Sequence, residues 1–275
     1  MAGKIRIGVG GWSYEPWRGL FYPEGLPQKR ELEFASRRLT SIEINSTYYS
    51  SFKPPSWIKW REETPGGFVF SVKASRFCTN RRELAGAGDS ITKFAGQGLA
   101  ELGDKLGPIN WQFMGTKRFE PDDMAAFLSL LPREAGGVPL RHALEVRHES
   151  FKDSRFYDLA RKHNVAIVFA DSEDYPAIDE ATADFVYARL MRTKKAVKTG
   201  YTTRELEEWA KGAKNWTKRG DVFVYFISGA KERAPAAAEA LIKLVSKGHV
   251  GAGKVSSPAS GPRAGKIRRS RGGGN

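Results

Sequence analysis

The segment Val165-Ala-Ile-Val-Phe-Ala170 is an uninterrupted apolar run. Such a run is typical of a strand that is buried on both faces, as the strands of parallel sheets are. A helix-like segment, 154–163, precedes it, and an earlier strand-like segment covers 141–146. A strand, a helix and a second strand in this order form a unit whose two strands run parallel. The rest of the chain repeats this unit.

The alternation of strands and helices extends in both directions from this unit. Eight strand-like segments cover residues 4–9, 41–45, 68–73, 108–113, 141–146, 165–170, 184–190 and 221–227. Helix-like segments cover residues 28–39, 56–63, 91–102, 121–131, 154–163, 203–218 and 236–245. Only the connection 174–183 lacks a convincing helix. The pattern predicts an α/β fold, a single TIM-like (β/α)8 barrel, because eight such units fit the roughly 250 residues typical of that fold. A doubly wound sheet is the rival that periodicity alone does not separate.

Charge and composition divide the chain into two parts. The 275 residues carry 45 basic and 31 acidic side chains, a net charge of +14, and 40% of the residues are hydrophobic. That apolar content is enough for a folded core, and residues 1–246 are expected to form the barrel domain. Residues 247–275 contain seven basic residues and no acidic ones among Gly, Ser and Pro. This composition predicts a disordered basic tail.

Three features bear on the compartment. The longest strongly apolar runs have six residues, whereas a membrane-spanning helix needs about 20. The amino terminus shows no apolar leader. Cys78 is the only cysteine, so an intrachain disulfide is excluded. Together these features predict a soluble cytoplasmic protein.

Nearly every expected strand ends in a polar or ionisable residue. In a parallel barrel the carboxyl ends of the strands form the active-site face. Side chains two residues apart on a strand share a face. The pairs that share a face are Glu43 with Asn45, Ser71 with Lys73, Glu145 with Arg147, and Tyr187 with Arg189. These residues predict a polar pocket at one mouth of the barrel.

Within this pocket the sequence suggests two sets of roles. The candidate catalytic residues are Glu43, Lys73, Glu145 and Asp171. The candidate substrate-binding residues are Trp12, Tyr14, Asn45, Tyr49, Gln112, Arg147, His148 and Arg189. A purely structural alternative is a buried network that closes the barrel mouth. In that network Glu43, Glu145 and Asp171 neutralise Lys73, Arg147 and Arg189 one for one.

The residue types favour acid–base chemistry on a small polar substrate, of the hydrolase or isomerase kind. Glu43 and Glu145 could act as an acid and a base if their side chains converge. The cations Lys73, Arg147 and Arg189 favour an anionic substrate. Lys73 could also be a Schiff-base nucleophile, which requires a lowered pKa that the sequence does not reveal. No cofactor is expected, and no metal, because tight His or Cys spacing is missing and Arg147 would repel a cation.

Several motifs together resemble one family. They are Ile7-Gly-Val-Gly-Gly-Trp-Ser-Tyr14, Trp17-Arg-Gly-Leu-Phe-Tyr-Pro23, Ser41-Ile-Glu-Ile-Asn-Ser-Thr-Tyr-Tyr49, Phe70-Ser-Val-Lys73, Leu102-Gly-Asp-Lys-Leu-Gly-Pro108, Glu145-Val-Arg-His148 and Thr182-Ala-Asp-Phe-Val-Tyr187. In this order they resemble the YecE-like family, catalogued as domain of unknown function 72. The resemblance implies a TIM-like barrel and no established reaction. It marks as family-pattern positions Trp12, Glu43, Asn45, Tyr49, Lys73, Gln112, Glu145, Arg147, His148, Asp171 and Arg189.

The chain also departs from the pattern that this resemblance implies. Relatives usually carry a histidine where this chain has Asn80, and leucine-histidine-glycine where it has residues 190–192, with Met191 in the middle. An asparagine pair and an aspartate are usual where this chain has Ile227-Ser-Gly-Ala230. These departures put in doubt any chemistry that needs the missing histidines, and they suggest either an altered substrate or a barrel without activity.

Two alternatives to an enzyme remain open. A nucleic-acid-binding protein would use the basic tail for nonspecific phosphate contacts and the aromatic rim for stacking on bases. A catalytically inactive barrel would serve as an interaction scaffold.

Overall fold

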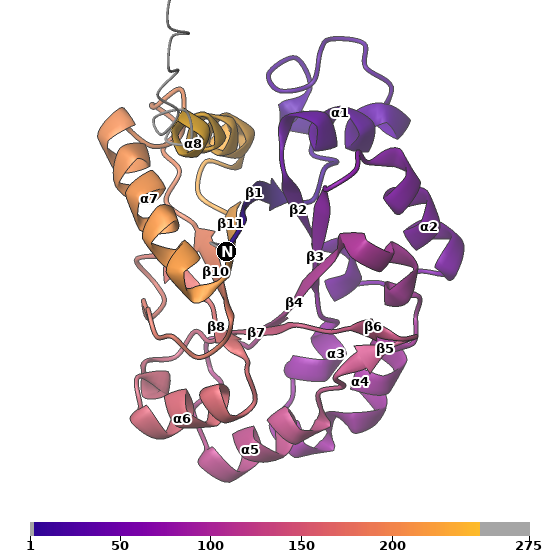
Figure 1. Cartoon of the computed structure of the whole chain (residues 1–275), viewed down its shortest axis with the longest axis vertical. Coiled ribbons are helices and arrows are strands. Elements are labelled where there is room, and N and C mark those ends of the chain that lie inside the picture. Colours follow the sequence, from indigo (N-terminus) through magenta and orange to yellow (C-terminus); the bar gives the residue numbers. More distant parts are fainter. Residues whose placement is uncertain (1–2, 248–275) are drawn as a thin grey trace, which may run out of the picture.

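A parallel sheet that curls into a barrel forms the centre of the structure, a computed structural model that describes residues 3–247 (Figure 1). Its strands are β1 Ile5–Gly10, β2 Ser41–Ile44, β3 Val69–Lys73, β4 Leu106–Gln112, β7 His142–Glu145, β8 Ala166–Ile167, β9 Phe169–Asp171, β10 Phe185–Leu190 and β11 Asp221–Phe226. They follow the order β8-β7-β4-β3-β2-β1-β11-β10-β9 around the barrel. The predicted α/β barrel of TIM type is therefore confirmed.

The sixth strand position is where the barrel nearly closes. The sequence predicts one strand over 165–170, but the structure divides it at Val168 into β8 and β9. β8 pairs with β7, whereas β9 pairs with β10. The Val168 amide still donates to the Leu144 carbonyl oxygen at 2.9 Å. Each half of the strand thus faces a different neighbour, and the two ends of the sheet meet at this residue.

Helices surround the barrel, as Figure 1 shows. They are α1 Glu31–Arg38, α2 Pro54–Glu63, α3 Arg76–Thr79, α4 Gly88–Ala95, α5 Pro121–Leu130, α6 Ser154–Lys162, α7 Thr203–Trp216 and α8 Ala234–Lys247. A two-stranded hairpin, β5 Glu134–Ala135 with β6 Val138–Pro139, lies outside the barrel. The prediction of one helix over 91–102 is wrong. The helix α4 ends at Ala95, and Gly98 then adopts a φ of 120°, a conformation that favours glycine, directly before a 3-10 segment at 99–105.

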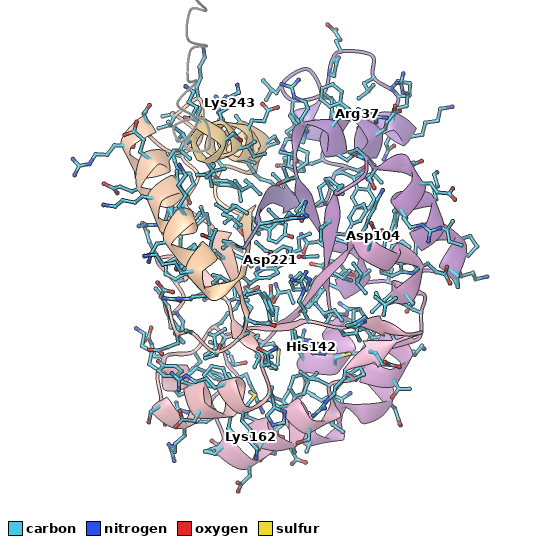
Figure 2. All side chains as sticks on the ribbon, viewed as in Figure 1. Arg37, Asp104, His142, Lys162, Asp221 and Lys243 are labelled. Carbon is cyan, nitrogen blue, oxygen red and sulfur yellow. The ribbon has the colours of Figure 1, made fainter. Side chains whose placement is uncertain are left out.

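Two layers of buried side chains follow from the period of two along each strand. One face of every strand packs against the helices, where Trp17, Trp57 and Trp111 are fully buried. The other face points into the barrel, whose apolar part consists of Val69, Ala143, Ala166, Val168, Phe185, Tyr187, Phe223 and Tyr225. Figure 2 shows side chains filling the interior of the strand ring. Polar side chains continue this interior face toward the carboxyl ends of the strands.

Glycine in β1 lets the backbone of that strand lie close to its neighbour. A Cβ atom built on Gly8 would lie 1.7 Å from the Ser41 carbonyl oxygen. Real Cβ atoms do not approach backbone oxygen this closely. A side chain at residue 8 would therefore separate β1 from β2.

His142, labelled in Figure 2, is a buried histidine that makes stability depend on pH. Its Nδ1 accepts from Trp111 Nε1 at 3.0 Å, so Nε2 carries the hydrogen and donates to the Pro132 carbonyl oxygen at 2.8 Å. Burial lowers the pKa of His142 from 6.5 to about 4. The folded state therefore binds this proton less readily than the unfolded state. Its contribution to stability is complete above pH 6.5 and is lost as the pH falls toward 4.

We expect wild-type protein to lose about 2 kcal/mol more than His142→Gln between pH 7 and pH 5, given 1.36 kcal/mol per pKa unit. Glutamine keeps one acceptor and one donor but does not titrate. Urea denaturation at both pH values measures the difference. Equal losses in the two proteins would show that His142 is protonated as easily in the folded state as in the unfolded state.

Two sequence-based expectations concern membrane spans and the basic tail. Among residues 3–247, no helix is long and apolar enough to cross a bilayer. The last helix, α8, includes Lys247, the first residue of the predicted tail. Residues 248–275, on which the expectations of disorder and of nucleic-acid contact depend, lie outside the described part of the chain.

Candidate active site

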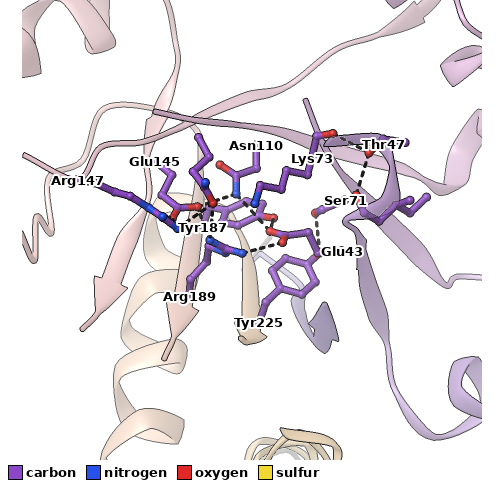
Figure 3. A network of polar contacts seen from close by, with 12 residues as sticks. Glu43, Thr47, Ser71, Lys73, Asn110, Glu145, Arg147, Tyr187, Arg189 and Tyr225 are labelled. Atoms are coloured by element: carbon purple, nitrogen blue, oxygen red, sulfur yellow. Dashed lines mark hydrogen bonds and ion pairs between the residues drawn. The ribbon is translucent and has the colours of Figure 1, made fainter. Parts of the chain in front are cut away.

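A buried cluster of ionised side chains lies where the barrel strands end (Figure 3). β2 contributes Glu43, β7 contributes Glu145 and β10 contributes Arg189, and their side chains are at most 2% exposed. Parallel strands bring these residues together although 146 positions separate Glu43 from Arg189 in the chain. The structure thus brings the two glutamates into one cluster, and their role as a shared functional site stays a prediction.

Arg189 joins the two carboxylates. Its Nη2 donates to Glu43 Oε1 at 3.0 Å, and its Nη1 donates to Glu145 Oε2. Asn110 makes a second connection, because its Nδ2 lies 3.3 Å from Glu43 Oε2 and 3.1 Å from Glu145 Oε2. A guanidinium shared between two carboxylates in a dry interior is held in one orientation, since any other would leave a charge unpaired.

Arg147 closes the outer side of the cluster. Its Nη2 donates to Glu145 Oε1 at 2.7 Å and to Gln112 Oε1 at 2.8 Å, and its Nε donates to the same glutamate oxygen at 2.9 Å. The outer face of the guanidinium lies 4.4 Å from the ring centroid of Tyr175. With its side chain 21% exposed, Arg147 is the member of the cluster that solvent reaches.

Tyrosine hydroxyls support the cluster from the interior of the barrel. Tyr187 donates its hydroxyl hydrogen to Glu43 Oε2. The Tyr225 hydroxyl lies 2.6 Å from Ser41 Oγ and 2.5 Å from Ser71 Oγ. Burial, with the nearby charge of Glu43 as the second cause, raises the pKa of Tyr187 well above 10. Tyr187 is therefore a permanent hydrogen donor to the glutamate.

The charges of the four ionised residues Glu43, Glu145, Arg147 and Arg189 balance. Burial alone would raise the pKa of Glu145, but Arg189, Arg147 and Lys73 outweigh that effect and hold the pKa at about 2. Glu145 is consequently ionised at neutral pH. Two carboxylates face two guanidiniums, and the cluster needs no further cation.

Lys73, at the end of β3, is a fifth charge next to this balanced set. It is 9% exposed, and no hydrogen bond or ion pair of its Nζ atom occurs within residues 3–247. The Nζ atom lies 4.3 Å from the centroid of the Tyr48 ring. Burial first, and the charge of Arg189 second, lower the pKa of Lys73 to about 8. The depressed pKa that a reactive lysine requires, which the sequence does not reveal, is present here.

Asp171 lies apart from the cluster and has its own cation. Its Oδ1 accepts from Arg192 Nε at 2.6 Å, and its Oδ2 accepts from the Tyr201 hydroxyl at 2.7 Å. The expected one-for-one pairing of three carboxylates with Lys73, Arg147 and Arg189 is therefore not what the structure has. Arg192 forms the ion pair with Asp171, and the guanidinium of Arg189 forms ion pairs with both glutamates.

A cavity of about 630 Å³ opens beside Asp171. Its lining residues are Ser172, Glu173, Asp174, Tyr175, Met191, Arg192, Thr193, Lys194, Tyr201, Glu205, Ser228 and Gly229. The departures from the family pattern at Met191 and residues 228–229 fall in this lining. Asn80, the other departure, exchanges a hydrogen bond with the Tyr48 hydroxyl at the rim, with Asn80 Nδ2 3.0 Å from the oxygen. Met191, Ser228 and Gly229 thus lie in the cavity beside Asp171, Asn80 lies against Tyr48, and none of them is a charged residue of the cluster.

The predicted aromatic rim forms a separate cleft of about 360 Å³. Trp12, Asn45 and Tyr49 line it, together with Trp60 and Lys231. Trp12 packs edge-on against Trp60 at a centroid distance of 5.3 Å. The buried Oδ1 of Asn45 has no hydrogen-bond partner among the described residues. Tyr14 does not line this cleft, and its ring lies 4.2 Å from Lys231 Nζ.

His148 has a local structural contact. Its Nδ1 accepts from the Ser150 amide at 3.1 Å and caps the short turn 149–151. Among the described residues, its side-chain hydrogen bonds are with Ser150 and not with the cluster. Its predicted role in substrate binding gains no support from this position.

Sequence analysis did not select Asn110, Tyr48, Tyr175 or Tyr225 as site residues. Asn110 was detectable, because it lies two positions before Gln112 on the same strand and must share its face. Tyr48 and Tyr175 lie in loops, where no period indicates the direction of a side chain.

These features define a class of protein: a (β/α)8 barrel with a buried, charge-balanced ion cluster at the carboxyl ends of its strands. The model of the family described as protein of unknown function DUF72 matches residues 6–262, and the chain belongs to this family.

Relatives and solved structures agree with this assignment. The UPF0759 protein YecE of Escherichia coli (strain K12) is 30% identical over 150 residues, which are 54% of this chain and half of YecE. The UPF0759 protein YunF of Bacillus subtilis (strain 168) is 26% identical over 220 residues, 77% of this chain and 75% of YunF. The crystal structure of a DUF72 family protein from Thermotoga maritima is similar in fold, with a TM-score of 0.70 at 22% identity, over 90% of this chain and 99% of that one.

Proposed function

We propose that this protein is an enzyme that performs acid–base chemistry on a small anionic substrate, which binds over the ion cluster at the carboxyl ends of the strands. One observation carries the proposal. Lys73 is a buried amine that lacks a hydrogen-bonding partner among the described residues and lies beside a set of charges that is already balanced.

The charge count supports an anionic substrate. When Lys73 is protonated, Lys73 and the two guanidiniums outnumber Glu43 and Glu145 by one. A substrate carboxylate or phosphate at the mouth would supply the missing negative charge. Arg147 is the residue best placed to receive it, because its guanidinium is partly exposed and its planar fork suits oxyanions.

The pKa values favour Lys73 as the group that exchanges protons. A pKa of about 8 leaves both the amine and the ammonium populated near neutral pH, as general acid–base catalysis requires. Glu145, with a pKa of about 2, has no proton to give at neutral pH. Glu43 and Glu145 are buried and tied to Arg189, so a role in fixing the local charge suits them better than the acid–base pair that the sequence suggests.

The proposal predicts oxyanion binding that depends on Arg147. We expect wild-type protein to bind inorganic phosphate or malonate in low salt, and Arg147→Gln to bind at least about tenfold more weakly, a loss of 1.4 kcal/mol from one charge-assisted contact. Isothermal titration calorimetry measures both affinities. Arg37→Gln, which changes an exposed arginine on α1, is the matched control and should bind like wild type. Equal binding by wild type and Arg147→Gln, or no binding by wild type, would contradict the proposal.

A further inference from the structure

The two most buried lysines of the described chain differ in what surrounds their amines. Lys105 is 8% exposed, and its Nζ donates to the carbonyl oxygens of Arg61 and Thr64, each at 2.6 Å, and to Thr64 Oγ1 at 3.0 Å. Three acceptors satisfy the three hydrogens of an ammonium. Lys105 thereby holds the carboxyl end of α2 and has the environment of a structural lysine.

Lys73 has the same degree of burial without those acceptors. Its side chain extends toward the glutamates and Asn110, as Figure 3 shows, but no oxygen within residues 3–247 accepts a hydrogen bond from it. The Nζ atom lies 4.3 Å from the centroid of the Tyr48 ring, whose face attracts a cation but takes no hydrogen bond of ordinary strength. The acceptors that Lys105 has are therefore missing here, and because Nζ is not among the buried polar atoms that lack a partner, water is the acceptor left for an ammonium at this position.

A neutral amine or an imine suits this environment better than an ammonium. An imine nitrogen carries no hydrogen, and a protonated imine carries one. The positive charge of a protonated imine would also lie near Glu43 and Glu145, whose positions Arg189 and Asn110 fix. The surroundings of Nζ therefore suit an imine nitrogen, which has fewer hydrogens than an ammonium and is bonded to a substrate carbon.

From this geometry we infer that Lys73 is a covalent nucleophile that forms an imine with the carbonyl carbon of a small anionic aldehyde or ketone. The inference rests on the proposed function, because the same Arg147 would hold the anionic group of this substrate. It narrows the substrate class from small anions in general to anions that carry a carbonyl group.

The reaction balances without a further reactant. The lone pair of the neutral Nζ amine adds to the carbonyl carbon, and one amine hydrogen passes as a proton to the oxygen to give a carbinolamine. The carbon–oxygen bond then breaks, the hydroxyl leaves as water with the second amine hydrogen, and a carbon–nitrogen double bond remains. One molecule of water leaves, nothing is oxidised or reduced, and the fraction of neutral amine at pH 7.5 is larger because the pKa of Lys73 is about 8.

Reductive trapping on the full-length protein tests the inference. Glyoxylate and pyruvate serve as the anionic probes and formaldehyde as the neutral one, each with sodium cyanoborohydride at pH 7.5, and peptide mapping by mass spectrometry reports the label at each lysine. We expect glyoxylate to label Lys73 at least about tenfold faster than Lys59, an exposed lysine on α2, because the lowered pKa leaves part of the Lys73 amine neutral at pH 7.5 and Arg147 holds the carboxylate of the probe. Lys105 should stay nearly unlabelled. In Arg147→Gln the preference of Lys73 for glyoxylate over formaldehyde should disappear.

Any other result of these experiments contradicts a specific claim: the imine, the anionic substrate class or the proposed function. If Lys73 is labelled no faster than Lys59 while phosphate or malonate still binds through Arg147, the imine is wrong and the anion site stands. If Lys73 is labelled rapidly but without preference for the anionic probes, the anionic substrate class is wrong. If neither labelling nor oxyanion binding occurs, both the inference and the proposed function fail.

Discussion

Arg189→Met is expected to lower the free energy of unfolding by about 3–5 kcal/mol, because removal of one partner of a buried ion pair leaves Glu43 without its hydrogen-bonded counterion. Here a single guanidinium serves both Glu43 and Glu145, and both carboxylates are almost completely inaccessible to water. Arg147 still neutralises Glu145 in this variant, but Glu43 keeps only neutral donors, Asn110 and Tyr187. Urea denaturation followed by tryptophan fluorescence measures the loss.

Two comparisons isolate the cause of that loss. Arg204→Met removes an arginine whose side chain is 89% exposed, and it should leave the unfolding midpoint unchanged. Adding Glu43→Gln to Arg189→Met should restore part of the lost stability, because the stranded carboxylate is then neutral. A loss of less than 1 kcal/mol in Arg189→Met would mean that water enters the cluster and solvates the glutamates.

Lys73→Met is expected to act in the opposite direction and to raise the free energy of unfolding by about 3 kcal/mol at pH 7, given 1.36 kcal/mol per pKa unit. The folded-state pKa of Lys73 is lowered from 10.5 to about 8. The folded state therefore opposes protonation, and below pH 8 it bears the full cost of a buried ammonium. Methionine fills a similar volume without a charge. The same urea titration at pH 7 measures the gain.

The pH dependence and a second lysine provide the checks on this prediction. As the pH rises from 8 to 10.5, the unfolded chain loses its advantage in binding this proton, so the gain from Lys73→Met should shrink. Burial lowers the pKa of Lys105 as well, but its amine makes three hydrogen bonds that the Lys73 amine lacks. Lys105→Met should therefore lower the free energy of unfolding by about 1–3 kcal/mol, since it leaves the carbonyl oxygens of Arg61 and Thr64 without their donor. If both lysine variants destabilise the protein, Lys73 is a structural cation.

Removal of Arg189 is expected to lower the free energy of unfolding, whereas removal of Lys73 is expected to raise it. This difference would mark Lys73 as a residue retained at the expense of stability. Strained or uncompensated groups of this kind occur at functional sites. Arg189 maintains the fold, whereas Lys73 costs stability and is the residue with chemistry available near neutral pH.

Much of the fold could be predicted from the sequence, because its strands show a period of two and are separated by amphipathic helices. The exceptions have local physical causes. The apolar pattern would continue one helix to residue 102, but α4 ends at Ala95 and Gly98 has a positive φ. The apolar pattern of 165–170 likewise shows no sign of the division at Val168. The strand period also indicated correctly that Glu145 and Arg147 share a face.

The partners within the site could not be predicted in the same way. A strand period shows which face a side chain occupies, but it does not show which residue across the barrel it meets. Asp171 was grouped with the central cations, yet it pairs with Arg192, which lies just beyond the end of β10. The lowered pKa of Lys73 depends on burial and on Arg189, 116 positions away by number, so it is a property of the closed barrel.

The position of Arg189 late in the chain has a consequence for folding. β1 to β8 already contain both glutamates, whereas their shared counterion arrives only with β10. A partial barrel would have to keep its interior hydrated, because dehydrating Glu43 before Arg189 is in place is too costly. Closure of the sheet and expulsion of water should therefore occur as one cooperative event. For a nascent chain emerging from the ribosome, this makes a stable half-barrel unavailable until most of the sequence has been synthesised.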